Sequence, residues 1–509
     1  MHISIKRGKA RYKVVNKRMI FYIIGIILEI EALLLLLPML VALYYKEPIS
    51  DYLITIGLLL LVGVASTIKK PKNAQIYARE GFVIVGLTWF VMSLFGALPF
   101  FLSGEIPNYI DAFFETVSGF TTTGASILTN VESMSKGLLF WRSFTHLIGG
   151  MGVLVFVLAI VPLGGSRSMH LMRAEVAGPT VGKIVPKMGD TAKILYALYL
   201  ALAMIQTAFL IFGGMPLYDS VIHAFGTAGT GGFGIKANSV ADYDSAYIEW
   251  VITIFMLLFS INFNLFYLIL IGKVRQALSS EELRWFFVIV IASIAVIAVN
   301  IMPMYDSVAK AIRLAAFQVA SIMSTTGYST CNFDLWPELS KSILVVLMFI
   351  GGCAGSTSGG LKISRVLILL KSVKNEMAKM LHPQYINTVR VEHKPLDNNV
   401  AKNACTYGVA YMIIMVLSFL LVSIDEFDFE TTMTAVFATL NDVGPGFNKV
   451  GPSGNFSMFS GFSKIVLICD MLIGRLEIFP ILMILAPSTW ISQKSYRKFF
   501  HRSEKMTEE

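Results

Sequence analysis

Charged residues are scarce in this sequence of 509 residues. Lys, Arg, Asp and Glu make up 15% of it, hydrophobic residues make up 55%, and the mean hydropathy is +0.68. Soluble globular proteins have about 25% charged and about 45–50% apolar residues, so the composition excludes an ordinary soluble domain. Apolar runs of helical length recur, whereas an outer-membrane barrel has segments of about ten residues with alternating polarity. We therefore expect an all-α membrane protein with many spans.

Cysteine is also rare. The four cysteines, Cys331, Cys353, Cys405 and Cys469, form no CxxC pair and mostly lie in or near apolar segments. Zinc sites and disulfide-stapled domains have characteristic cysteine spacings, and this sequence shows neither. We interpret the four cysteines as packing residues.

Catalytic motifs are missing as well. The sequence contains no HExxH zinc-protease motif and no GxSxG nucleophile motif. A membrane-embedded hydrolase would need one such set of catalytic residues, so we expect that the protein is not an enzyme. The stretch GTGGFG at residues 229–234 fits the dinucleotide fingerprint GxGxxG. No strand precedes it and no βαβ unit surrounds it, so we do not expect a nucleotide site there.

The net charge of +9 is distributed over loops beside apolar spans and forms no separate basic domain. This pattern indicates membrane orientation and not nucleic-acid binding, because Lys and Arg are retained on the cytoplasmic side. It predicts cytoplasmic N- and C-termini. The first apolar run, residues 19–45, is longer than a signal-peptide core, so we expect a retained helix. The basic stretches are residues 6–18, 68–79, 167–193, 273–284, 371–402 and 494–505.

A four-fold repeat follows two accessory helices, which are expected at residues 19–43 and 52–68. Each repeat has a spanning helix, a half-length helix, a glycine-bearing loop and a second spanning helix, which predicts about ten spans around one pore. The half-length helices are expected at residues 109–120, 217–228, 311–323 and 430–440. The second helices are expected at residues 138–162, 247–273, 340–371 and 459–491. The units are residues 1–80 with the accessory helices, then repeats at 81–165, 166–275, 276–375 and 376–509, the last with the C-terminal tail.

Glycine loops follow the half-length helices. They read TTTGAS at residues 121–126, GTGGFG at 229–234, STTGYS at 324–329 and DVGPGF at 442–447. A segment of about 12 residues cannot cross a bilayer as a helix, so each must enter and return. Irregular backbone at that depth must be buried in protein or line water. Four such loops can meet on one axis, where backbone carbonyls replace the hydration shell of a cation.

Glycine permits the φ angles that turn successive carbonyl groups towards one axis. We therefore expect Gly124, Gly231, Gly327 and Gly444 to be the pivots of an ion-selectivity filter. The negative dipole ends of the half-length helices also favour a cation there. The predicted ion-binding residues, which would hold a cation, are Thr122, Thr123, Gly124, Thr230, Gly231, Thr325, Thr326, Gly327, Asp442, Val443 and Gly444.

These loops resemble those of the Trk/Ktr/HKT superfamily of potassium transporters, as do LIGGMGVLVF at 147–156, FIGGCAGSTSGGLK at 349–362 and LIGRLEIFP at 472–480. The two additional N-terminal helices make the chain similar to the bacterial TrkH-type potassium-uptake subunit. The resemblance implies channel-like potassium uptake across the inner (plasma) membrane. In that superfamily a glycine in all four loops accompanies potassium preference, so Gly124 favours potassium. A sodium-permeable transporter, or one coupled to sodium or protons, is the alternative.

Asp442 departs from the family pattern, because related loops tend to carry an amide there. A carboxylate would raise the cation concentration at the mouth of the filter or alter selectivity.

Five glycines interrupt an apolar stretch at residues 351–360. Each costs about 1 kcal/mol of helix stability relative to alanine, which favours a broken helix over a close packing surface. By resemblance this stretch is a gating loop below the filter. The predicted gate residues are Gly351, Gly352, Gly355, Gly359, Gly360 and Arg475.

Arg475 lies in an apolar segment, where a guanidinium costs several kcal/mol unless it is paired or solvated. One interpretation is a structural pair with Glu477 or Asp470. The family resemblance implies instead an electrostatic barrier that faces the ion path.

Four further polar residues have structural interpretations. We expect His146 and His223 to be hydrogen-bonded interior residues, and Asp111 and Asp219 to be helix caps or dipole partners.

Two basic connections, residues 164–190 and 372–399, are either linkers or docking surfaces. The resemblance implies a homodimer and a cytosolic, nucleotide-binding, TrkA-like regulatory subunit. No cofactor is expected beyond potassium ions, and a nucleotide would act through that partner. Membrane lipid is the other expected contact, and nucleic acid is not expected.

Overall fold

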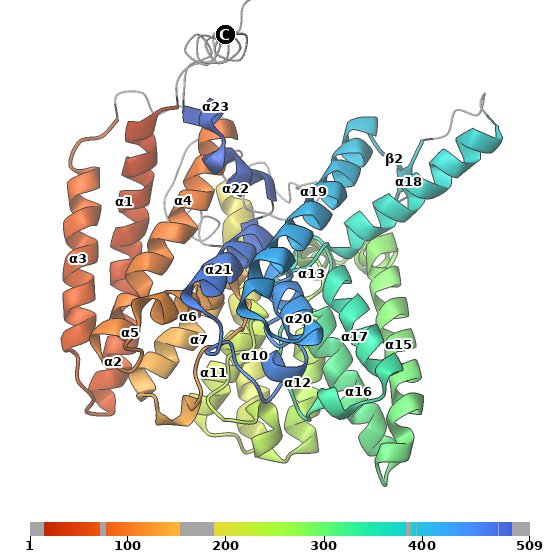
Figure 1. Cartoon of the computed structure of the whole chain (residues 1–509), viewed down its shortest axis with the longest axis horizontal. Coiled ribbons are helices and arrows are strands. Elements are labelled where there is room, and N and C mark those ends of the chain that lie inside the picture. The colour runs from red at the N-terminus through yellow and green to blue at the C-terminus, as the bar shows by residue number, and fades with distance from the viewer. Residues whose placement is uncertain are drawn as a thin grey trace, which may run out of the picture.

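The computed structural model describes residues 15–71, 78–152, 188–382, 388–392, 394–476 and 478–490, and their regular structure is almost entirely helical (Figure 1). The exception in these ranges is a hairpin of two-residue strands, β1 (Arg390–Val391) and β2 (Lys394–Pro395), which pair antiparallel. The predicted all-α class is confirmed.

The accessory helices form one edge of the molecule, coloured red in Figure 1. They are α1 (Lys17–Leu34), α2 (Leu36–Tyr44) and α3 (Ser50–Thr67). The predicted first helix is thus divided at Leu35, just before Pro38, whose nitrogen cannot donate to the preceding turn. Gly25 and Gly63 face each other between α1 and α3, and their lack of side chains lets the two backbones approach closely.

All four repeats begin with a long helix followed by a half-length helix. The long helices are α4 (Ala78–Gly96) with its continuation α5 (Leu98–Leu102), α10 (Met188–Phe212), α15 (Glu281–Ile301) and α19 (Asn398–Val422). The half-length helices are α6 (Tyr109–Thr121), α11 (Leu217–Gly229), α16 (Val308–Met323) and α20 (Phe429–Leu440). Their predicted positions are confirmed to within about three residues at each end, which is the usual uncertainty of helix boundaries.

The second helices end early or are divided within the described residues. The break in the third one was predicted at residues 351–360, whereas the bend in the second was not, and residues 153–162 of the first lie outside the described residues. The second helices comprise α7 (Lys136–Gly150); α12 (Ala246–Phe259) and α13 (Phe263–Leu270); α17 (Glu338–Ile350) and α18 (Ile363–Leu381); and α21 (Gly461–Leu476), α22 (Ile478–Leu485) and α23 (Pro487–Trp490). The chain bends by 93° between α12 and α13. Ser260 donates its hydroxyl to the Met256 carbonyl, and Asn262 caps α13, so polar side chains satisfy the backbone at this break.

Short helical turns complete the described elements. They are α14 (Val274–Leu278), η1 (Val131–Ser133), η2 (Ser239–Tyr243), η3 (Met302–Met304), η4 (Phe333–Leu335), η5 (Ser423–Asp425) and η6 (Asn448–Val450).

Within the described ranges, six helices are long and apolar enough to cross a membrane, or seven if α12 and α13 count as one bent span. The prediction of about ten spans also counted the second helices, most of which are divided into shorter pieces. On α19 the side chains of Val409, Ile413, Val416 and Leu420 are exposed, as expected for a surface that faces lipid. The chain is a multi-pass membrane protein.

The half-length and second helices alternate in a closed ring. In order of contact, the ring runs α6, α7, α11, α12, α16, α17, α20, α21 and back to α6. Each half-length helix therefore packs against the second helix of its own repeat and against that of a neighbouring repeat. This arrangement brings the four glycine loops together inside the ring. Large fully buried side chains such as Phe114, Trp141 and Tyr328 fill the space around them.

Candidate functional site

Four backbone triplets at the ends of the half-length helices share one conformation. They cover residues 122–124, 230–232, 325–327 and 442–444, and we call them together the loop ring. The first residue of each triplet has φ between 54° and 59°, and the third is a glycine with φ between 72° and 95°. Positive φ is uncommon outside glycine, so four copies of this pattern show that the same backbone turn is repeated in all four loops.

The pivot predicted for the second loop was wrong by one residue. Gly232, with φ of 72°, has the conformation of Gly124, Gly327 and Gly444, whereas Gly231 takes the middle position of its triplet. Adjacent glycines at 231 and 232 made the register ambiguous in the sequence. The aromatic residue after the pivot was the available signal, because Gly232 precedes Phe233 as Gly327 precedes Tyr328.

The triplets contact one another in cyclic order through their backbones. A methyl group on any pivot glycine would collide with the middle carbonyl group of the next triplet. The four approaches, pivot first, are Gly124 to Gly231, Gly232 to Thr326, Gly327 to Val443 and Gly444 to Thr123. The structure thus brings all the predicted ion-binding residues together and adds Gly232. A closed set of carbonyl oxygens of this kind can coordinate a dehydrated cation without a fixed charge.

Hydroxyl groups behind the loop ring are bound to neighbouring side chains. The Oγ1 atoms of Thr121 and Thr123 lie 2.8 Å apart, and Oγ of Ser324 lies 2.6 Å from Oγ1 of Thr326. These bonds fix the middle residues of the first and third triplets. The carboxyl-terminal ends of all four half-length helices also lead into the ring, which favours positive charge there.

Asp442 lies on the face of the loop ring that is covered by residues 351–362. Gly359 packs directly against Asn441 and Asp442. Thr123 donates to Oδ1 of Asp442 at 2.8 Å, while the buried Oδ2 has no hydrogen-bond partner among the described residues. One carboxylate oxygen is therefore available at the base of the ring.

Residues 351–362, which we call the crossing loop, separate α17 from α18. The predicted break of the helix at these glycines is confirmed, because Gly351, Gly355 and Gly360 have positive φ. The crossing loop spans from the bend after α12 to the base of the loop ring. Cys353 N donates to the Ser260 carbonyl at 3.0 Å, and Gly359 N donates to Thr325 Oγ1 at 2.7 Å. The loop therefore contacts the loop ring directly.

Arg475 joins the crossing loop to the end of α7. Its Nη1 donates to the Thr357 carbonyl at 2.7 Å, and its Nη2 donates to the carbonyls of Gly149 and Gly150 at 2.5 and 2.6 Å. The last carbonyls of a helix lack partners within the helix and carry its negative dipole end, so they suit a guanidinium. Of the two predicted partners, Asp470 accepts a hydrogen bond from Ser418 at 2.6 Å, and Glu477 lies outside the described residues.

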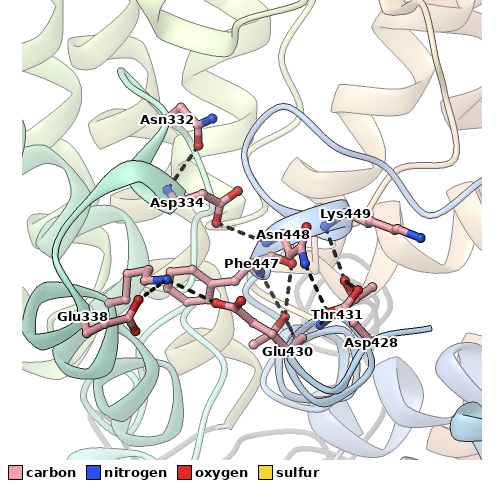
Figure 2. Close-up of polar contacts among 11 residues, drawn as sticks. Asn332, Asp334, Glu338, Asp428, Glu430, Thr431, Phe447, Asn448 and Lys449 are labelled. Atoms are coloured by element: carbon pink, nitrogen blue, oxygen red, sulfur yellow. Dashed lines mark hydrogen bonds and ion pairs between the residues drawn. The ribbon is translucent and has the colours of Figure 1, made fainter.

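A polar strap on the opposite face connects the third and fourth repeats (Figure 2). Asp334 accepts from Asn448 N at 3.2 Å, and Asp428 accepts from Asn448 Nδ2 at 3.1 Å and from Thr431 N at 2.9 Å. Burial raises the pKa of Asp334. Burial acts in the same direction at Asp428, but hydrogen bonds from Thr431 and Asn448 outweigh it and hold the pKa of Asp428 below its usual value.

The two histidines differ. Nδ1 of His223 lies 2.8 Å from the Asp219 carbonyl, so its predicted hydrogen bond is confirmed. For His146 the prediction was wrong, because its buried ring stacks on Phe233 at 4.2 Å and neither ring nitrogen has a hydrogen-bond partner among the described residues. Stacking thus replaces hydrogen bonding at this site.

Asp111 and Asp219 lie in the first turns of α6 and α11, as predicted for dipole partners, but neither is the cap. Asn108 caps α6, Asp111 pairs with Lys464 at 2.6 Å, and Asp219 accepts from the Tyr243 hydroxyl at 2.8 Å.

The four cysteines are all free. Cys353 is buried, as predicted for a packing residue, whereas Cys405 and Cys469 are exposed, so the packing interpretation was wrong for these two. In the part of the chain that the structure describes, no group of three or more His, Cys, Asp and Glu side chains could hold a metal ion.

Comparison with known proteins gives consistent matches along the chain. The model of a family described as TrkH, cation transport protein, matches residues 50–494. The Trk system potassium uptake protein TrkH of Salmonella typhimurium is 35% identical over 485 residues, with 93% of this chain and 99% of that protein covered. The Trk system potassium uptake protein TrkG of Escherichia coli is 31% identical over 482 residues, with the same coverage. The crystal structure of the potassium transporter TrkH from Vibrio parahaemolyticus has a TM-score of 0.84 at 32% identity, with 94% of this chain and 100% of that chain covered.

Proposed function

The chain belongs to the TrkH family of cation transport proteins, and from this premise we propose that it takes up potassium ions through the loop ring. The cyclic backbone contact of the four triplets is the observation that carries the proposal. Carbonyl oxygens there replace the hydration shell of the ion, and no covalent chemistry is needed. An inside-negative membrane potential supplies about 2.3 kcal/mol per charge per 100 mV.

The loop ring is the selectivity filter in this proposal. Its residues are the predicted set with Gly232 in place of Gly231 as the second pivot. A glycine at all four pivots supports a preference for potassium, as the superfamily resemblance implies. The carboxylate of Asp442 favours the second candidate, a sodium-permeable or sodium- or proton-coupled transporter, because a charged oxygen at the ring attracts cations more strongly than a carbonyl does.

The crossing loop is the gate. Its hydrogen bond from Gly359 to Thr325 supports this role, because a loop held at the base of the ring blocks the ion path in the inactive protein. Arg475 holds this arrangement through Thr357 and adds a positive charge that repels cations.

A second copy of the chain is the proposed partner in the membrane. Helix α18 projects from the body of the molecule (Figure 1) and carries exposed apolar side chains at spacings of three and four residues. Leu370, Val373, Met377 and Leu381 are each at least 60% exposed and lie along one stripe. Such a stripe is buried when two copies pack together, which supports a homodimer.

A cytosolic, nucleotide-binding regulatory subunit is the proposed soluble partner, by family resemblance. Of its two predicted docking segments, most of residues 164–190 lies outside the described residues, and residues 372–399 contain the end of α18 and the β hairpin. The protein lies in the inner (plasma) membrane with both termini in the cytoplasm. It is not an enzyme and binds no cofactor besides the transported ion.

Rubidium uptake into proteoliposomes tests the function. Vesicles with a potassium gradient and purified protein should accumulate rubidium, and sodium in excess should inhibit this uptake only weakly. The variant Gly327→Ser should lose the discrimination, because its side chain collides with the Val443 carbonyl and displaces the ring.

The same assay separates the alternatives. Equal inhibition by sodium and potassium would favour the sodium-permeable candidate. Full retention of selectivity by Gly327→Ser would remove this glycine from the filter, and the absence of any cation flux would contradict the proposed transport.

A further inference from the structure

A buried ion pair lies directly behind the first two loops of the ring. Nε of Arg142 on α7 donates to Oε1 of Glu115 on α6 at 2.6 Å, and their side chains are 3% and 0% exposed. Neither residue stands in a recognisable motif, and the two are 27 positions apart. No sequence pattern therefore pairs them.

The carboxylate of Glu115 also accepts two hydrogen bonds from residues of the first loop. Ser126 Oγ donates to Oε1 at 2.9 Å, and Ile127 N donates to Oε2 at 2.9 Å. These residues come two and three positions after the pivot Gly124. The carboxylate therefore fixes the strand of backbone that leaves the first triplet.

Arg142 makes the corresponding contacts with the second loop. Its Nη1 donates to the Gly234 carbonyl at 3.1 Å, and its guanidinium carbon lies 3.4 Å from the centre of the Phe233 ring. Phe233 and Gly234 follow the pivot Gly232 directly. One ion pair thus connects the outgoing backbones of two neighbouring triplets.

The other repeats lack this carboxylate. Seven positions before the first residue of each triplet, the half-length helices carry Glu115, His223, Gln318 and Ala435 in turn. Other groups hold the later loops, such as the Tyr328 hydroxyl, which donates to the Phe233 carbonyl at 3.3 Å, and Thr434 Oγ1, which accepts from Phe447 N at 2.9 Å. Of these four equivalent positions, only that of Glu115 therefore provides an ion pair between neighbouring loops.

We infer that Glu115 and Arg142 are a positioning pair that sets the separation of the first two loops and thereby the discrimination between potassium and sodium. The inference rests on the proposed filter. The pair is hydrogen-bonded to loop residues 126, 127 and 234, so a change in the pair is transmitted to the pivots next to them. A filter selects between ions of different size through the number and placement of its carbonyl groups, so a shift of two loops changes the selectivity.

The test compares rubidium and sodium fluxes of Glu115→Gln, Arg142→Gln and the double variant, per folded protein in proteoliposomes. Each single change should lower the ratio of rubidium to sodium flux about tenfold, and the double variant should lower it no further, because the two side chains act as a unit. Asp111→Asn is the matched control, since it breaks an ion pair one turn earlier on the same helix, with Lys464, and should leave the ratio within about twofold.

A purely structural role predicts that both fluxes fall together and the ratio stays constant, and this result would overturn the inference. So would an equal change of the ratio in Asp111→Asn. If Glu115→Gln does not fold, Ser126→Ala decides, because it removes one hydrogen bond to the carboxylate and keeps the ion pair; an unchanged ratio there also overturns the inference. Wild-type vesicles without rubidium flux would contradict the proposed function itself.

Discussion

Asp442 is the residue at which this loop ring differs most from a set of neutral oxygens. Three triplets begin with threonine, and the fourth begins with a carboxylate whose Oδ2 has no hydrogen-bond partner among the described residues. A charged oxygen attracts a small cation more strongly than a large one, because the small ion approaches more closely. The ring therefore combines backbone carbonyl groups with one charged group, which favours a small cation over a large one.

Asp442→Asn should raise the ratio of rubidium to sodium flux by about fivefold, which corresponds to about 1 kcal/mol. The amide keeps the size of the side chain and still accepts the hydrogen bond from Thr123. Competition of sodium with rubidium uptake measures the change. Asp470→Asn is the control, because Asp470 is equally buried but binds Ser418. Unchanged affinity and selectivity in Asp442→Asn would exclude a role in ion choice.

Single residues of the site were only partly predictable. The Thr-Gly motifs identified three of the four pivots, but in the second loop consecutive glycines hid the register. The contact of Gly232 with Thr326 of the next loop, where a side chain would collide, is not visible in the local sequence. The partners of Arg475 were likewise out of reach, because it binds backbone groups of distant segments. Those of Glu115 were not predicted either, because Arg142 lies on another helix and no motif links the two.

At the scale of helices, two breaks position the crossing loop. The glycines at residues 351–360 predicted one break correctly. The 93° bend between α12 and α13 was missed, because Ser260 and Asn262 are isolated polar residues in a long apolar run. Their hydroxyl and amide groups satisfy the free backbone of the bend, which a hydropathy pattern does not reveal. The crossing loop needs both breaks, since Cys353 donates to the Ser260 carbonyl exposed by the bend.

Arg475→Ala should raise rubidium flux in the absence of any regulatory partner. The change removes the hydrogen bond to Thr357 and the tie between the crossing loop and α7. One hydrogen bond to a charged group contributes about 1.5 kcal/mol, so we expect an increase of about tenfold or more. Flux per folded protein measures it, and Arg475→Lys, which keeps the charge, should lie between the two. A lower melting temperature without any gain in flux would show that the arginine is only structural.

On the scale of the whole molecule, the fold depends on contacts between repeats that are far apart in sequence. Each half-length helix was predictable from its own composition, and the accessory helices from their apolar runs. The cyclic order of the loops was not, because the closing contact joins Gly444 to Thr123 across more than 300 residues. Straps such as the one in Figure 2 hold the fourth loop against the third on the face opposite the crossing loop.

Asp428 makes the stability of this strap depend on pH. Its pKa is lower in the folded protein than in the unfolded chain, so its contribution to stability is present above the unfolded value of about 3.9. That contribution is lost as the pH falls through the folded pKa. Asp428→Asn keeps a side chain that caps α20 but removes the charge. The wild type should therefore melt at a higher temperature than the variant at pH 7, and the difference should shrink towards pH 3. An equal difference at both pH values would contradict this linkage.

The cyclic contact of the pivots occurs within one polypeptide, and this removes a constraint that a pore of four identical subunits has. In such an assembly every substitution occurs four times, so a carboxylate at the position of Asp442 would add four negative charges to the ring. In this chain a single substitution changes only one of the four triplets. The chain can therefore hold a single acid, a single ion pair and three threonines at formally equivalent places, and its ion preference can be adjusted in steps of one side chain.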